Sequence, residues 1–219
     1  MSIPGESMAK CSKCGQSHKI TIYKSINAAT DPSLKDKVRD GSLFLWECPH
    51  CGTMNLARYE TLYHDPAEKL MVWLLPEGDV SDKEAQAASL LDGYTLRKVK
   101  DVGSLIEKIN ISGCSLDDRA IEICKYVTKM ELGGQEQDKS KGAAIMDAPF
   151  RFFKTEGADN ELSFTFPLDG NMHTVKIGFN VYEDCQRIIK RNTSMEADPG
   201  FVSIDSAWVL GKLGQAGRD

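Results

Sequence analysis

The chain has 219 residues, of which 41% are hydrophobic, and this length suits one large or two small domains. The formal net charge of −5 argues against a general binder of polyanions. Seven cysteines cannot all pair in internal disulfides, and the apolar runs are too short for a membrane span. Residues 1–10 lack the features of a signal peptide. We therefore expect a cytoplasmic protein with reduced thiols.

Residues 9–80 are predicted to form a zinc-ribbon-like β unit, preceded by a disordered leader over residues 1–7. Residues 19–24 alternate in polarity with the period of a strand. Asp31, as N-cap, and Gly41, as the stop signal, predict a short helix between them. Further strands are predicted in residues 42–47, 53–59, 62–64 and 70–75.

Two cysteine motifs lie within this unit, CSKCG at residues 11–15 and CPHCG at residues 48–52. Each has the form of a zinc knuckle, in which two intervening residues let one turn aim both sulfurs at an ion about 2.3 Å away. Glycine after the second cysteine permits a positive φ, so that backbone N–H groups turn toward the sulfurs. We therefore expect one structural Zn²⁺, bound by Cys11, Cys14, Cys48 and Cys51.

Other interpretations of these cysteines stay open. They include disulfides and a redox-active pair, although a redox Cys-x-x-Cys should begin a helix and strand-like sequence follows both motifs here. Four thiolates leave no coordination position for substrate or water, which argues against metal catalysis. A redox sensor that releases zinc on oxidation would need exposed, reactive thiolates. His50, inside the second motif, and His18 are outside candidates for a metal ligand.

Residues 81–132 are predicted to be a helical segment. A capping-box pattern at Ser81 predicts a helix to Leu91, a short strand follows in residues 95–100, and Asp101 begins a second helix through Ile109. The clearest helix covers residues 116–132, with apolar positions at helical spacing: Leu116, Ala120, Ile123, Cys124, Val127 and Met130. Gly133 and Gly134 end it, and the polar residues 133–142 are predicted to be a linker.

Residues 143–219 are predicted to form a C-terminal α+β unit. Turn signals at residues 157–160 and 168–171 predict antiparallel hairpins, with Val175 to Val181 as the third strand. Two helices are expected to follow the strands, the first over residues 182–192 and the second from Asp205. The second helix is expected to bury Trp208 and Leu210. The chain as a whole is predicted to be α+β: a zinc-ribbon-like β unit, a helical middle segment and an antiparallel β-hairpin unit with closing helices.

With these residues in view, the chain resembles the CpXC domain family of bacterial proteins, named for paired Cys-Pro-x-Cys motifs. The second motif fits that name, and the first has Ser12 at the proline position. The surrounding sequence also fits over residues 11 to 75, in SIN (25–27), DPSLK (31–35), GSLF (41–44) and LYHD (62–65). The resemblance implies metal binding by the four cysteines and brings no established activity.

The remaining candidates have structural explanations as alternatives. His64 beside Asp65 could form a base, but neighbouring residues of a strand point to opposite faces, so a structural turn is the alternative. Cys114, Cys124 and Cys185 are interpreted as buried small hydrophobic residues. The familiar nucleotide-binding, serine-hydrolase and metalloprotease motifs do not occur in the sequence.

Residues 10–58 carry eight basic and four acidic side chains. This surplus permits nucleic-acid contact, although a solvated face also explains it. The basic candidates for such a surface are Lys13, Lys19, Lys35, Lys37 and Arg39. We expect an interaction module with a structural zinc, and we favour a protein partner over nucleic acid. The alternatives are an enzyme that uses the metal or His64 and Asp65, and the redox sensor.

Overall fold

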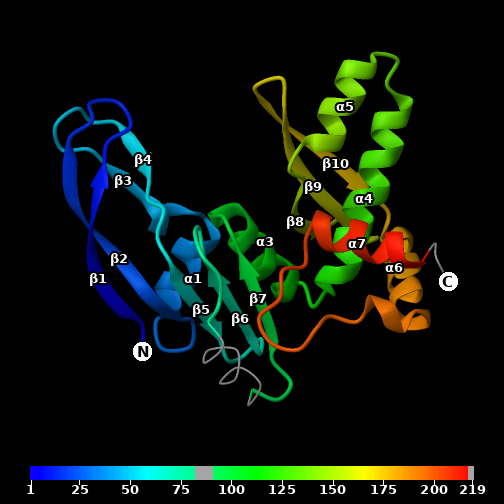
Figure 1. Ribbon diagram of the computed structural model, residues 1–219, viewed down its shortest axis with the longest axis horizontal. Helices are drawn as coiled ribbons and strands as arrows, with labels where there is room; N and C mark the ends of the chain where they lie inside the picture. The colour runs from blue at the N-terminus through cyan, green and yellow to red at the C-terminus, as the bar shows by residue number, and fades with distance from the viewer. Residues whose placement is uncertain (82–90, 217–219) are drawn as a thin grey trace. The chain divides into compact units, whose positions relative to one another are not determined.

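The computed structural model describes residues 1–81 and 91–216 (Figure 1). The helix predicted from Ser81 to Leu91 falls largely on residues outside this part of the chain. The described residues form six α-helices and three sheets, which confirms the mixed α+β class. The chain divides into two compact units: Met1–Ile109 with Pro199–Val202, and Asn110–Asp198 with the chain from Ser203 onward.

A five-stranded sheet with the order β1-β2-β5-β6-β7 organises the first unit (Figure 1). Its strands are β1 (Ile3–Lys10), β2 (Ser17–Asn27), β5 (Thr61–Asp65), β6 (Leu70–Leu74) and β7 (Thr95–Val99). The β1–β2 and β5–β6 pairs are antiparallel, whereas β2–β5 and β6–β7 are parallel. Buried and half-buried positions alternate along β5 and β6, so both strands pack hydrophobic side chains on both faces of the sheet.

The prediction of a disordered leader was wrong, because β1 pairs with β2 from Ile3 to Lys10. Ser2 adds a second attachment, since its backbone N–H donates to Asp31 Oδ2 at 3.0 Å and its hydroxyl accepts from Asn27. Asp31 does occupy the N-cap position of α1 (Pro32–Arg39), but its side chain is directed to Ser2 and makes no cap hydrogen bond.

One face of this sheet carries the main hydrophobic core of the first unit. Leu34 and Val38 of α1 are buried there, as predicted, together with Leu105 of α3 (Val102–Gly113). Asp101 begins α3 as predicted, accepting from the Ser104 N–H at 2.9 Å. The opposite face is covered by a smaller cluster that includes Leu96, Trp73 and Phe201.

The strand predicted in residues 42–47 forms only in part. Gly41 has a φ of 79°, and this turn leads into a 3₁₀ helix, η1 (Ser42–Phe44), which buries Phe44. Only β3 (Leu45–Glu47) remains extended, and it pairs with β4 (Met54–Leu56) in a separate two-stranded sheet. The strand predicted in residues 53–59 is likewise limited to β4.

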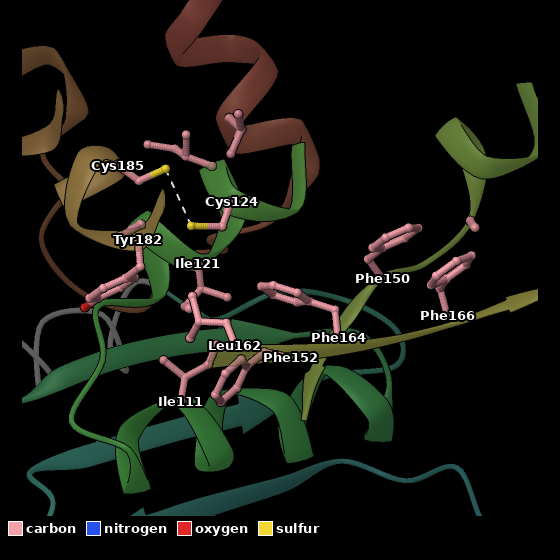
Figure 2. Close-up of a cluster of buried hydrophobic side chains, with 14 of the residues drawn as sticks. Ile111, Ile121, Cys124, Phe150, Phe152, Leu162, Phe164, Phe166, Tyr182 and Cys185 are labelled. Atoms are coloured by element: carbon pink, nitrogen blue, oxygen red, sulfur yellow. Dashed lines mark hydrogen bonds between the residues drawn. The ribbon is translucent and has the colours of Figure 1, made fainter. Parts of the chain in front are cut away.

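The second unit contains a three-stranded antiparallel sheet with the order β10-β9-β8. Its elements are β8 (Arg151–Glu156), β9 (Glu161–Leu168), β10 (Asn171–Ile177), α4 (Asp118–Gln135), α5 (Lys139–Asp147), α6 (Phe179–Arg191), η2 (Thr193–Met195) and α7 (Ser206–Ala216). Figure 2 shows Phe152 and Phe164 of the sheet beside Ile121 of α4, in one buried cluster. Both predicted hairpins are confirmed, but the third strand ends at Ile177, because Gly178 caps α6.

The glycines of the predicted linker have a different role from the one expected. The helix α4 continues through Gly133 and Gly134 to Gln135, and α5 begins four residues later. A Cβ placed on Gly142 would lie 2.9 Å from the carbonyl oxygen of Gly133, and the reverse contact is 3.3 Å. These glycines therefore permit two neighbouring helices to approach closely.

The apolar stripe predicted for α4 is only half right. Ala120, Ile123 and Cys124 are buried, but Val127 is 43% and Met130 is 51% exposed. In α7, Leu210 is similarly exposed, at 55%, whereas Val209 is fully buried. Trp208 is only partly buried.

Among residues 1–81 and 91–216, no helix has the length and apolar character that a membrane span requires.

Candidate metal centre

Two β-hairpins present the four cysteines at their tips. The first motif closes the hairpin of β1 and β2, where Lys10 pairs with Ser17, and the second closes that of β3 and β4, where Glu47 pairs with Met54. The same turn forms twice, because a glycine N–H donates to the first cysteine's carbonyl in each: Gly15 to Cys11 at 3.0 Å, and Gly52 to Cys48 at 2.8 Å. The positive φ of both glycines, 73° and 66°, explains why glycine follows each pair.

The hairpin tips bring all four sulfurs into one cluster. The Sγ atoms lie within 4.8 Å of one another, with 3.6 Å between Cys11 and Cys51 and 3.6 Å between Cys14 and Cys48. A tetrahedral ion with metal–sulfur bonds of about 2.3 Å separates its sulfurs by about 3.8 Å. All four are free thiols, and close contacts join one motif to the other. The geometry therefore suits a metal ion shared by both hairpins.

Electrostatics give the clustered thiols very different acidities. Backbone N–H groups of Cys14 and Lys13 lower the pKa of Cys11 to about 6, against the effect of burial. The Gln16 N–H acts to lower the pKa of Cys14, but burial and the neighbouring thiols outweigh it and raise this pKa to about 12. Four thiolates this close cannot all ionise unaided, whereas a divalent cation would stabilise them together.

A set of polar side chains surrounds the sulfurs. His18 Nε2 lies 3.4 Å from Cys48 Sγ, and Thr53 Oγ1 lies 3.3 Å from Cys51 Sγ. Asn55 is buried on β4 and its Nδ2 lies 3.7 Å from Cys11 Sγ. Its Oδ1 accepts from both the backbone N–H and the hydroxyl of Ser12, at 2.9 and 2.8 Å, so Asn55 connects the second hairpin to the first.

The structure gives the two candidate histidines different positions. His50 is exposed on the second turn, whereas His18 is half-buried, with its ring centroid 6.0 Å from that of Trp46. His18 is thus a neighbour of the cluster through Cys48. Sequence reasoning missed Asn55 and Thr53. The available signal was their place directly after the second knuckle, where a β-hairpin points alternate side chains back toward its tip.

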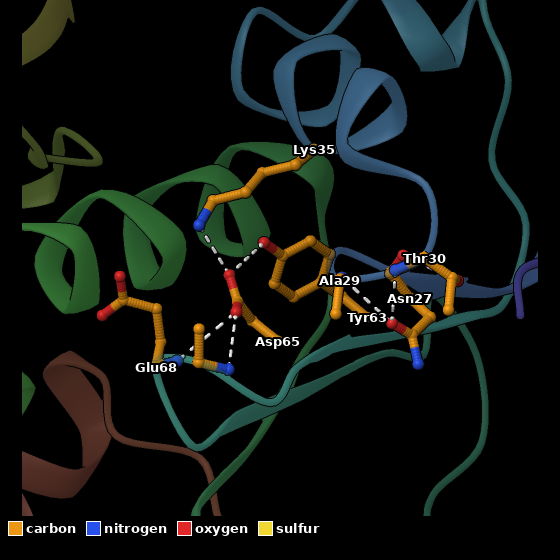
Figure 3. Close-up of polar contacts among 8 residues, drawn as sticks. Asn27, Ala29, Thr30, Lys35, Tyr63, Asp65 and Glu68 are labelled. Carbon is orange, nitrogen blue, oxygen red and sulfur yellow. Dashed lines mark hydrogen bonds and ion pairs between the residues drawn. The ribbon is translucent and has the colours of Figure 1, made fainter.

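The other catalytic candidates, His64 and Asp65, make separate contacts. His64 Nε2 lies 3.2 Å from the hydroxyl of Tyr94. The buried Asp65 carboxylate accepts from Lys35 Nζ at 2.6 Å and from the Tyr63 hydroxyl at 3.2 Å, and Figure 3 shows both donors directed at it. Burial raises the pKa of Asp65, but the hydrogen bonds from Lys35 and from the backbone of Glu68 outweigh this and lower it.

Two of the five candidate basic residues are engaged with carboxylates. Lys35 pairs with Asp65, and Lys19 Nζ lies 2.6 Å from Glu6 Oε2 on the neighbouring strand. Lys13, Lys37 and Arg39 are exposed.

The three remaining cysteines lie in the second unit. Cys124 and Cys185 are buried in its hydrophobic core, as predicted, and their Sγ atoms lie 3.5 Å apart (Figure 2). The contact with Cys185 raises the pKa of the Cys124 thiol, and burial adds to this effect. Cys114 is only partly buried, with its Sγ 3.9 Å from Thr155 Oγ1.

Paired hairpin tips with four clustered cysteines define a protein with a potential metal centre built from two Cys-x-x-Cys-Gly turns. The family model of the CpXC protein matches residues 9–125, which is more than half of the chain. The chain therefore belongs to the CpXC family, as its motifs suggest. Comparisons with curated proteins and with solved structures gave no match.

Proposed function

We propose that this chain is an interaction module whose N-terminal hairpins form a zinc-ribbon-like unit around one structural Zn²⁺. The observation that carries the proposal is the cluster of four sulfurs within 4.8 Å at two hairpin tips with matching turns. Thiolates are soft ligands, and a tetrahedral set of four favours zinc. All four positions would be filled by protein, so the metal would stabilise structure. A reducing compartment, such as the cytoplasm, would keep the thiols available.

The local fold supports a structural role for the metal. The β3–β4 ribbon has only three residues in each strand, and an isolated ribbon of this kind is marginal in water. Asn55 connects the ribbon to Ser12 in the first hairpin, and an ion bound by both tips would add a much stronger connection.

The surface of the second hairpin favours a protein partner over nucleic acid. Leu45 and Leu56 face each other across the ribbon and are 48% and 50% exposed, and Met54 beside them is 56% exposed. Exposed apolar side chains of this kind suit contact with another protein. Among the basic candidates, Lys19 and Lys35 are already paired with carboxylates, which reduces the charge available for phosphates.

The alternative of an enzyme using His64 and Asp65 gains little from the contacts of these residues. Asp65 is held by an ammonium group, a phenol and the backbone N–H groups of Ala67 and Glu68, so its oxygens are engaged structurally. The redox-sensor alternative has one specific observation in its favour, because Cys14 and Cys51 are only partly buried.

Metal content tests the metal part of the proposal. Protein purified without added metal should contain about one zinc per chain by elemental analysis. Cys48→Ser should lose the metal, while the matched Cys185→Ser, in the other unit, should keep it. A disulfide within either cysteine pair, or a metal-free native protein, would contradict the proposal.

The partner class needs a separate experiment. Gel shifts with single- and double-stranded DNA and RNA at low salt should show no binding at micromolar protein. Crosslinking in cells should capture a protein partner that is lost in Leu45→Asp and retained in Thr21→Val, a change on an exposed position of β2. Nucleic-acid binding that disappears with Lys37→Glu and Arg39→Glu would instead assign the basic surface to nucleic acid.

A further inference from the structure

The four sulfurs of the cluster differ in their access to solvent. Cys48 is 0% and Cys11 is 2% exposed, whereas Cys14 and Cys51 are partly exposed. A reagent in solution would therefore reach the second cysteine of each motif before the first.

The sulfurs also differ in their polar neighbours. Cys48 has His18, Cys11 has Asn55 and Cys51 has Thr53 within 3.3 to 3.7 Å of its Sγ. Among the hydrogen bonds of the described residues, the side-chain contacts of Cys14 Sγ are with other cysteines, and its remaining donor is the backbone N–H of Gln16.

These differences matter once the sulfurs are thiolates bound to a metal. A side-chain N–H or O–H donor withdraws charge from a thiolate, which lowers its nucleophilicity and holds it in place on the ion. Cys51 is accessible, but the Thr53 hydroxyl, which accepts from its thiol, can donate to it once it is a thiolate. Cys11 and Cys48 have Asn55 and His18 beside them and are buried. Cys14 alone combines access with the absence of a side-chain donor in the described part of the chain.

We propose that Cys14 is the modification site of the centre, at which small carbon electrophiles react and thereby release the metal. This inference rests on the proposed zinc site. In the reaction the Cys14 thiolate attacks the electrophilic carbon, a C–S bond forms, and the leaving group departs with its electron pair. With iodoacetamide the C–I bond breaks and iodide leaves. The product is a neutral thioether, a much poorer zinc ligand than a thiolate, so three thiolates remain for the ion.

The test uses the full chain with its native metal, after elemental analysis has established the zinc content. Substoichiometric iodoacetamide is added, the reaction is quenched with acid, and peptide mapping measures the label at each cysteine while a chromogenic chelator reports free zinc. Label at Cys14 should exceed label at Cys11, Cys48 or Cys51 by about tenfold or more, the scale on which outer hydrogen-bond partners act. Zinc release should follow Cys14 labelling in time.

A variant pair tests the role of the donor. Thr53→Val removes the hydroxyl beside Cys51 and should bring Cys51 labelling up toward that of Cys14. Thr21→Val removes an exposed hydroxyl elsewhere and should leave the distribution unchanged. A zinc-containing wild-type chain that labels first at Cys51, Cys11 or Cys48 overturns this inference alone. A chain that contains no zinc overturns the proposed function as well.

Discussion

Removal of the proposed zinc should unfold the tip of the β3–β4 hairpin and leave the five-stranded sheet folded. The perturbation is Cys48→Ser or treatment with a chelator. The β3–β4 ladder has only three residue pairs, whereas the β1–β2 ladder that carries the first knuckle has eight and belongs to the large sheet. The second knuckle would therefore depend on the proposed zinc more than the first would. The base of its ribbon remains attached, because Trp46 packs on the core of the first unit.

The size of the effect follows from three quantities. A structural zinc contributes an apparent free energy on the order of 10 kcal/mol. Bound zinc can protect the backbone amides of the hairpin tip from hydrogen exchange only up to the free energy of unfolding of the whole domain, about 5 to 15 kcal/mol. A short two-stranded ribbon by itself has a free energy of unfolding near zero. Loss of about 5 kcal/mol of local stability, at 1.4 kcal/mol per factor of ten, predicts amide exchange faster by roughly 10³-fold or more.

Hydrogen exchange followed by mass spectrometry measures this directly. Protection should fall in peptides that contain the Cys48 and Gly52 amides, which donate to Thr53 and Cys48 carbonyls. Peptides from β5 and β6 should keep their protection. Cys185→Ser is the control, since it lies in the other unit. Equal loss across β5 and β6, or unchanged exchange at the tip, would refute the reasoning.

Three further predictions concern stability, measured by chemical denaturation. Asp65→Asn should cost about 1 to 3 kcal/mol at neutral pH, because it removes the charge that Lys35 faces. Because the pKa of Asp65 is lowered in the folded state, its ionised carboxylate stabilises the fold fully above pH about 4. This stabilisation should be lost as the pH falls through the folded-state pKa of Asp65. Phe164→Ala should cost about 3 to 5 kcal/mol, because Phe164 is fully buried, and the exposed Val127→Ala should cost little. Gly142→Ala should cost about 1 to 3 kcal/mol through its clash with the Gly133 carbonyl, whereas Gly134→Ala, with open space around it, should be neutral or stabilising.

Each of these has a result that contradicts it. If the Asp65→Asn variant loses as much stability in acid as the wild type does, Asp65 is not the group whose protonation causes the loss. Equal effects of Phe164→Ala and Val127→Ala would contradict the burial on which the comparison depends. A stabilised Gly142→Ala would mean that the two helices do not approach closely at this glycine.

Much of the local structure follows from the sequence because short-range chemistry determines it. The spacing within each cysteine motif, with its glycine, predicts a turn that the structure contains twice. The strands β5 and β6 are also predictable, since the Asp65–Pro66 turn separates two short segments rich in strand-forming residues. In these cases each residue's conformation is decided by its near neighbours in the chain.

The sequence fails where a distant part of the chain decides the outcome. Gly133 looks like a helix stop, yet its lack of a side chain accommodates the carbonyl of Gly142 on α5. Val127 and Met130 match the helical repeat of α4 but are exposed, because the buried face of that helix also takes Glu122 and Lys125, which pair at 2.7 Å. The role of Asn55 beside the cysteine cluster can be seen only in the folded chain, because its partners Ser12 and Cys11 lie more than 40 residues away in the sequence.

The discontinuous first unit has a consequence for the order in which the protein can fold during synthesis. The chain leaves this unit after Ile109 and returns only for Pro199–Val202. There the carbonyl of Val202 accepts from the Lys98 N–H at 3.0 Å, and Phe201 packs edge-on against Trp73. A nascent chain that has emerged only as far as residue 125, where the family match ends, still lacks Phe201 and Val202 and therefore both of these contacts. The ribosome must therefore synthesise the chain as far as Val202 before the first unit can be completed.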